Sequence, residues 1–208
     1  MEASTAGSRL NLLLEKWGLA PLDAVSAGKF EAYFSLILRW SAKVNVTAIR
    51  NKEGILSRHF LESIACARAL PEGIGTLLDY GSGAGFPGLP IALCRPEIAV
   101  TLAESQGKRA AFLREAARTL GVTVKVRAQR AETLGERYGC VTLRAVDRMQ
   151  EAVAAAVQCV APSGWLALMT TSGDLTRLEK AAGTQLKWSD PIPLPGGESR
   201  LLALGRRE

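Results

Sequence analysis

The chain has 208 residues, of which 48% are apolar and 22% charged, so an intrinsically disordered chain is excluded and one domain, with or without a small appendage, is expected. Four well-separated cysteines without a Cys-x-x-Cys pair argue against a zinc site and against a disulfide framework. A signal-peptide pattern and an apolar run of about eighteen residues are both missing, which predicts a cytoplasmic protein without a membrane partner. The single histidine, His59, excludes a mechanism that needs two.

Most of the net charge of +6 falls in one short stretch. Residues 104–130 carry seven basic and two acidic side chains, a net charge of +5. The basic residues are Lys108, Arg109, Arg114, Arg118, Lys125, Arg127 and Arg130. Such a concentration is typical of a surface that binds a polyanion, although a solvated basic helix face has the same composition.

The N-terminal third of the chain is predicted to be helical. A short helix is expected over residues 10–17, and apolar residues at helical spacing predict a second helix over 30–41. A third helix is expected over 52–70, with a break at 45–47 and an end at Pro71.

Beyond Pro71, short apolar runs alternate with helical patterns. Strands are expected near 76–80, 98–103, 122–127, 140–144 and 164–170, and helices near 87–94, 107–120, 147–160 and 174–182. This alternation predicts βαβ units and a mostly parallel sheet, and two terminal strands near 186–189 and 201–204 predict an antiparallel hairpin at its edge. We therefore expect a seven-stranded α/β domain over 71–208, with a helical cap over 1–70.

The densest motif is a glycine-rich turn, Asp79-Tyr80-Gly81-Ser82-Gly83-Ala84-Gly85-Phe86-Pro87-Gly88, between a strand and a helix. Glycines here let the backbone turn tightly and approach a ligand at the helix N-terminus. Read as Gly83-x-Gly85-x-x-Gly88, the turn matches a dinucleotide fingerprint and predicts a nucleotide-dependent (NAD or FAD) oxidoreductase. Read as Asp79-x-Gly81-x-Gly83-x-Gly85, it matches the first motif of S-adenosylmethionine (SAM) methyltransferases.

Asp79 and the prolines after the turn favour SAM over a dinucleotide, whereas Glu104 fits the ribose of either ligand. Asp79 stands where it can act, through water, on the methionine part of SAM, and Pro87 lacks the N–H donor that a pyrophosphate would use. Glu104 closes the second strand, where an acid can bind the ribose hydroxyls, and Ala131 and Glu132 follow the third strand, where adenine would lie. The alternative for Glu104 is a helix N-cap neighbour, and the alternative for Ala131 and Glu132 is the start of a surface helix.

Together these segments resemble the ribosomal RNA small subunit methyltransferase G family, also called glucose-inhibited division protein B. The resemblance rests on Trp40-x-x-x-Val44-Asn45-Val46-Thr47-Ala48-Ile49, Arg58-His59-Phe60-Leu61-Glu62-Ser63, the glycine turn with Leu89-Pro90, Glu104-Ser105-x-x-Lys108-Arg109-x-x-Phe112-Leu113, Arg144-Ala145 and Glu198-Ser199-Arg200. It covers most of the chain from about residue 10 to residue 205.

The resemblance implies a Rossmann-like class I SAM-dependent methyltransferase fold and methyl transfer from SAM to N7 of one guanine in bacterial 16S ribosomal RNA. It implies that Gly81, Phe86, Ala131, Glu132 and Arg144 contact the cofactor. The partner would be 16S ribosomal RNA or the small ribosomal subunit, and we expect a monomer.

The expected RNA contacts are Arg58, Lys108, Arg109 and Arg200, each of which could instead be a solvated surface charge. Guanine N7 has a free lone pair, so no catalytic base or metal is expected and positioning would supply most of the rate. His59 is expected to pack or to hydrogen-bond rather than to catalyse.

The chain departs from the family pattern at two places. Thr170-Thr171 stands in place of the family's usual Lys-Gly pair, and Leu143 replaces the Ser that precedes Arg144. An RNA-binding relative without activity is therefore a further alternative.

Overall fold

The computed structural model of the protein describes residues 5–49 and 51–208; residues 1–4 of the expected helical cap and residue 50 lie outside this part. The helices before the sheet are α1 (Ala6–Lys16), α2 (Ala24–Ser41), α3 (Lys52–Gly54), the π-helix η1 (Ile55–Leu61) and α4 (Glu62–Ala69). Side chains cap the first two helices: Thr5 accepts a hydrogen bond from the Ser8 N–H, and Asp23 accepts one from the Ser26 N–H. The expected helices are confirmed, except that the third contains seven residues of π-helix.

The remaining elements alternate as expected. The strands are β1 (Thr76–Tyr80), β2 (Ala99–Ala103), β3 (Val124–Arg127), β4 (Tyr138–Arg144), β5 (Val160–Thr171), β6 (Leu186–Trp188), β7 (Ile192–Pro193) and β8 (Arg200–Arg207). The helices between them are α5 (Gly88–Cys94), α6 (Gly107–Leu120), the 3-10 turn η2 (Ala131–Thr133), α7 (Met149–Gln158) and α8 (Ser172–Ala182). Gly121, with φ 61°, ends α6 in a left-handed conformation that favours glycine.

The strands form one twisted sheet in the order β3-β2-β1-β4-β5-β8-β6, with β7 paired to β8. β3, β2, β1, β4 and β5 are mutually parallel, whereas β8 runs antiparallel to β5 and to β6. The mostly parallel sheet and the antiparallel C-terminal strands confirm the predicted architecture. The sheet has eight strands rather than seven because two residues, Ile192 and Pro193, add a short pairing to β8.

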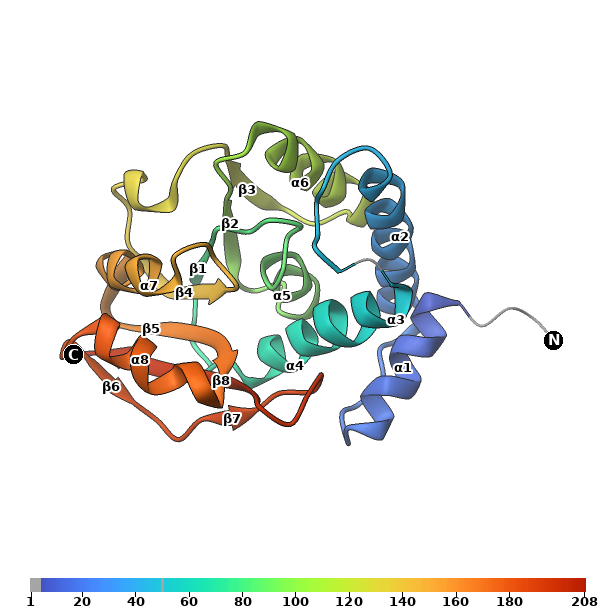
Figure 1. Cartoon of the computed structure of the whole chain (residues 1–208). Helices are drawn as coiled ribbons and strands as arrows, with labels where there is room; N and C mark the ends of the chain where they lie inside the picture. Colours follow the sequence, from blue (N-terminus) through green and yellow to red (C-terminus); the bar gives the residue numbers. More distant parts are fainter. Residues whose placement is uncertain (1–4, 50) are drawn as a thin grey trace.

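Helices cover both faces of the sheet (Figure 1). One face carries α5 and α6 together with the N-terminal helices, and buried side chains of α7 and α8 pack on the other. This division follows from strand alternation, since Leu77 of β1 joins the first cluster and its neighbour Leu78 joins the second.

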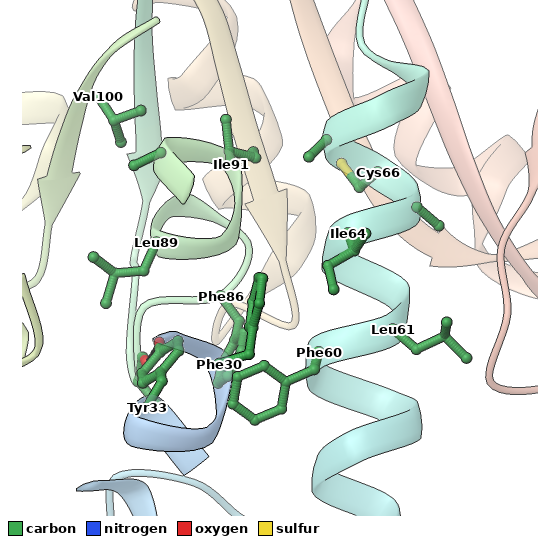
Figure 2. Close-up of a cluster of buried hydrophobic side chains, with 14 of the residues drawn as sticks. Phe30, Tyr33, Phe60, Leu61, Ile64, Cys66, Phe86, Leu89, Ile91 and Val100 are labelled. Carbon is green, nitrogen blue, oxygen red and sulfur yellow. Dashed lines mark hydrogen bonds between the residues drawn. The ribbon is translucent and has the colours of Figure 1, made fainter. Parts of the chain in front are cut away.

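The N-terminal helices are built into the core of the first face. Figure 2 shows Phe30 and Tyr33 of α2 beside Phe60 of η1 and Phe86 of the glycine turn. The Phe60 ring lies edge-on to both Tyr33 and Phe86, at centroid distances of 5.1 and 5.2 Å. The helical segment therefore fixes the position of the glycine turn, and a domain boundary at residue 70 stays a prediction. Within the described residues, no helix is both long and apolar enough to cross a membrane.

Candidate functional site

A cavity of about 870 Å³ opens at the carboxyl ends of β1, β2 and β4. β1 and β4 are neighbours in the sheet, but the chain continues from β1 into α5 on one face and from β4 into α7 on the other. Such a switch point leaves a crevice beyond the strand ends, which is where open α/β sheets bind ligands.

The glycine turn forms one wall of this cavity. Gly81 and Gly83 line it, with φ of 71° and 55°, a backbone conformation that side chains disfavour. Gly85, with φ 87°, faces the core instead: a Cβ there would lie 2.6 Å from the Tyr33 hydroxyl and 2.6 Å from Leu89 Cδ1. The same turn thus presents backbone to a ligand and packs closely on α2 and α5.

Asp79 lies beneath the turn and outside the cavity lining. Its carboxylate is buried and accepts hydrogen bonds from the Gly88 N–H at 3.2 Å and the Thr142 hydroxyl at 2.9 Å. Burial raises the pKa of Asp79 to about 6, although these hydrogen bonds favour the charged form. Asp79 therefore joins the glycine turn to β4, and its contact with a cofactor stays a prediction.

Glu104 lies at the cavity wall formed by the end of β2, as its position after the strand predicted. It is 5% exposed, and its two oxygens accept hydrogen bonds from the backbone N–H groups of Gly83, at 2.9 Å, and Gln106, at 2.7 Å. The carboxylate is thereby held against the glycine turn. It retains further acceptor capacity for hydroxyl donors in the cavity.

Ala131 and Glu132 line the far end of the cavity at the start of η2. The Glu132 carboxylate accepts a hydrogen bond from the Tyr80 hydroxyl at 2.7 Å, and burial raises the pKa of Tyr80 well above its ordinary value. The first N–H of a helical turn has no partner inside that turn, so Ala131 offers a backbone donor at this end.

A second wall of the cavity is an ion-pair cluster that the sequence did not reveal. Glu62, fully buried at the start of α4, lies 3.2 Å from Arg58, 3.1 Å from Arg144 and 3.2 Å from Arg200. We call these four residues the Glu62 cluster. Only the spacing of Arg58 and Glu62, four positions apart on one helix, could have suggested part of it.

The Glu62 cluster leaves an excess of positive charge at the cavity. The side chain of Arg58 is 44% exposed and that of Arg200 is 15% exposed, and both residues line the cavity. The Arg144 side chain is only 7% exposed, and burial lowers its pKa even though Glu62 favours the charged form. Its Nε atom is buried without a hydrogen-bond partner among the described residues.

His59 lies between the two walls. Its Nδ1 is 2.9 Å from Arg144 Nη1 and its Nε2 is 2.6 Å from Thr47 Oγ1, while its ring stacks on Phe86 at 4.7 Å. Phe86 lines the cavity, and its contact with a cofactor stays a prediction. Burial, followed by the charges of Arg144 and Arg58, lowers the pKa of His59 to about 3, so the imidazole is neutral at physiological pH.

The basic stretch 104–130 is divided between two faces of the sheet. Val124 and Val126 of β3 pack against the core that α6 also covers, so Lys125 and Arg127 project to the opposite face. Arg127 pairs with Glu136 at 3.2 Å, and Arg130 pairs with Glu132 at 3.5 Å. The stretch is therefore not one continuous docking surface.

Of the two predicted RNA contacts on α6, one borders the cavity. Arg109 lines it and donates hydrogen bonds to the backbone carbonyl of Asn45 at 3.3 Å. Lys108 is exposed and lies outside the lining. Thr170 and Thr171, at the position of the usual Lys-Gly pair, end β5 beside Arg200 of β8 and are likewise outside the lining.

Comparisons with known proteins agree with this geometry. A methyltransferase from Pyrococcus furiosus has a TM-score of 0.62 at 11% identity, covering 86% of this chain and 98% of that one. A SAM dependent methyltransferase from Aquifex aeolicus has a TM-score of 0.58 at 14% identity, covering 74% of this chain and 93% of that one. At these identities the likeness concerns the fold, which is that of class I SAM methyltransferases.

Sequence comparison gives the family. The ribosomal RNA small subunit methyltransferase G of a Roseiflexus species (strain RS-1) is 38% identical over 205 residues, covering 90% of this chain and 86% of that protein. The family model described as GidB, rRNA small subunit methyltransferase G, matches residues 26–187. The family match covers more than half of the chain and the relative is 38% identical over most of both proteins, so the chain belongs to the rRNA small subunit methyltransferase G family.

Proposed function

We propose that the protein transfers a methyl group from SAM to N7 of a guanine in 16S ribosomal RNA. The observation that carries this proposal is the cavity itself, which is lined by both a glycine turn and an excess of arginine charge in a chain of this family. The first wall suits a nucleoside cofactor, and the second suits a polyanionic substrate.

The residues of the first wall fit SAM. Gly81 and Gly83 leave room for the ligand to approach the backbone, and Glu104 offers carboxylate oxygens to the ribose hydroxyls. Ala131 and Glu132 stand at the end where adenine would lie, and Phe86 at the end near His59. When bound, SAM would supply an electrophilic methyl group on a sulfonium.

The chemistry requires positioning rather than a base. Guanine N7 attacks with its own lone pair, so no proton has to leave before the methyl group is transferred. His59 is unsuited to serve as a base because both ring nitrogens already have partners, Arg144 and Thr47. The protein has to hold the base in line and to exclude water.

The Glu62 cluster would bind the RNA backbone near the reacting base. Glu62 accepts hydrogen bonds from Arg58 and Arg200 and forms an ion pair with Arg144. These contacts orient Arg58 and Arg200 at the cavity, and the three arginine charges exceed that of the single carboxylate. Arg109 would extend this contact along α6, and Lys108 would meet phosphates outside the cavity. We further propose a cytoplasmic monomer that acts on 16S ribosomal RNA or the small ribosomal subunit.

Two measurements, made one after the other, test the proposal. Calorimetry should show SAM binding to the purified protein, and NADH should not bind; the opposite pattern would support an oxidoreductase. Labelled SAM should then transfer its methyl group to small subunits or ribosomal RNA from cells that lack the gene. SAM binding without any transfer to either substrate would identify an inactive RNA-binding relative instead.

A further inference from the structure

The loop before α3 contributes a buried hydroxyl to the cavity. Thr47 is 7% exposed, lines the cavity, and takes part in two hydrogen bonds. Its Oγ1 lies 2.6 Å from Nε2 of His59 and 3.1 Å from the backbone nitrogen of Ile49. The direction of the first bond decides what Thr47 can offer to a substrate.

The neighbours of His59 fix that direction. Arg144 Nη1 lies 2.9 Å from Nδ1, and a guanidinium group has only donors, so Nδ1 must accept. A neutral imidazole with an accepting Nδ1 carries its hydrogen on Nε2. Burial and the nearby arginines, which lower the pKa of His59 to about 3, keep the ring in this neutral form. Nε2 therefore donates to Thr47.

Thr47 is left as a donor only. Its oxygen accepts one hydrogen bond from His59 and one from the Ile49 N–H, which uses both lone pairs. Neither bond uses the hydroxyl hydrogen. On the basis of the proposed function, we propose that the Thr47 hydroxyl donates to O6 of the substrate guanine and thereby selects guanine over adenine.

The edge of the purine explains the selection. Guanine presents two adjacent acceptors, N7 and O6, whereas adenine presents N7 beside an N6 amino donor. A donor-only hydroxyl can pair with O6 while N7 keeps its lone pair for the methyl group, but it meets the adenine amino group with donor against donor. Thr47 moves no proton in this scheme and acts by orienting the base.

Purine analogues at the methylated position test the inference. Wild-type protein is compared on RNA that carries guanosine, 2,6-diaminopurine or 2-aminopurine there; all keep N7, but only guanosine has O6. We expect kcat/KM on guanosine to exceed that on either analogue by about 10- to 100-fold, because a buried donor is otherwise left unpaired. The ratio should fall to about twofold in Thr47→Val and should persist in Thr47→Ser.

Two controls accompany the analogues. Thr123→Val, at an exposed position before β3, should keep the wild-type ratio, and SAM affinity should be unchanged in every variant. A Thr47→Val protein that prefers guanosine over the analogues as strongly as the wild type does would overturn the inference. The proposed methyl transfer to guanine would not be affected by that result. If Thr47→Val fails to fold, equal wild-type rates on guanosine and 2-aminopurine would overturn it just as well. Wild-type protein that methylates no guanine N7 would overturn the proposed function and the inference together.

Discussion

The two walls of the cavity are built in different ways. The first wall, called here the glycine wall, is the part of the glycine turn that lines the cavity, residues 81–84 and 86, and it presents mainly backbone. The Glu62 cluster instead joins side chains from η1, α4, β4 and β8, of which Glu62 and Arg200 stand 138 positions apart. A wall of the first kind is readable as a motif because each residue is fixed by its neighbours. A wall of the second kind forms only after the sheet and the helices have packed. Its residues therefore form no sequence motif, and the cluster cannot be predicted from any one of them.

The largest effect should come from the Glu62 cluster. Glu62→Gln leaves three guanidinium groups around a neutral side chain and should lower the free energy of unfolding by about 3–5 kcal/mol. Denaturant titration measures this loss. Glu151→Gln removes a surface pair with Arg148 and should cost less than about 1 kcal/mol. Equal effects of the two changes would contradict a structural role for the cluster.

The next effect concerns Asp79 under the glycine wall, and its sign depends on pH. The pKa of Asp79 is about 6 in the folded protein, above its ordinary value of 3.8, so stability is lost as the pH rises from about 4 to about 6. Asn at this position can still accept from Gly88 and can donate to Thr142. Asp79→Asn should therefore gain at most about 3 kcal/mol relative to the wild type above pH 6. A stability difference that is constant between pH 4 and pH 7 would show that Asp79 titrates normally.

A smaller loss is expected from adding a side chain on the core side of the glycine turn. Gly85→Ala places a Cβ against the Tyr33 hydroxyl and Leu89 at a positive φ, so it should cost about 1–3 kcal/mol and weaken SAM binding about tenfold. Gly121→Ala is the matched control, since it also has a positive φ but an added Cβ meets no atom within 4 Å. It should lower stability slightly and leave SAM affinity unchanged in calorimetry. Equal SAM affinities of Gly85→Ala and Gly121→Ala would show that the close packing at Gly85 does not contribute to cofactor binding.

The smallest effect should fall on RNA binding alone. Arg58→Ala removes one exposed charge at the cavity, so RNA affinity should drop a few-fold and the slope of log K against log salt should decrease by about one. SAM affinity should not change. Arg118→Ala, on the exposed part of α6 outside the cavity lining, should change neither the affinity nor the slope. A larger loss of RNA affinity in Arg118→Ala than in Arg58→Ala would contradict RNA binding at the Glu62 cluster.

The sequence predicted most of the fold because periodicity is local. β1 and α6 match the expected ranges 76–80 and 107–120, and the switch from helices to alternating elements falls at Pro71 as expected. The π-helix at 55–61 and the two-residue β7 were missed, because the first differs from an α-helix only in its hydrogen-bond register and the second is too short to show a strand period. A π-helix changes which side chains of a regular helical pattern face the core, and here it carries Arg58 and His59 to the cavity.

The candidate site was predicted only in part. Gly81, Gly83 and Glu104 reached the cavity because strand ends in a parallel sheet meet at one edge. Glu62 was visible in the sequence, but a buried acid is recognised only through the arginines that surround it. The charge count over 104–130 could not distinguish the two faces of β3, because alternation along a strand separates neighbours in sequence.

Methylation of ribosomal RNA by the purified protein tests the central claim most directly. Small subunits and 16S ribosomal RNA from cells that lack the gene are incubated with the protein and isotopically labelled SAM, and mass spectrometry of RNA fragments and nucleosides locates and identifies the labelled base. We expect one labelled guanine, methylated at N7, at a single position. Label on another atom or another base, or no label despite SAM binding, would contradict the account.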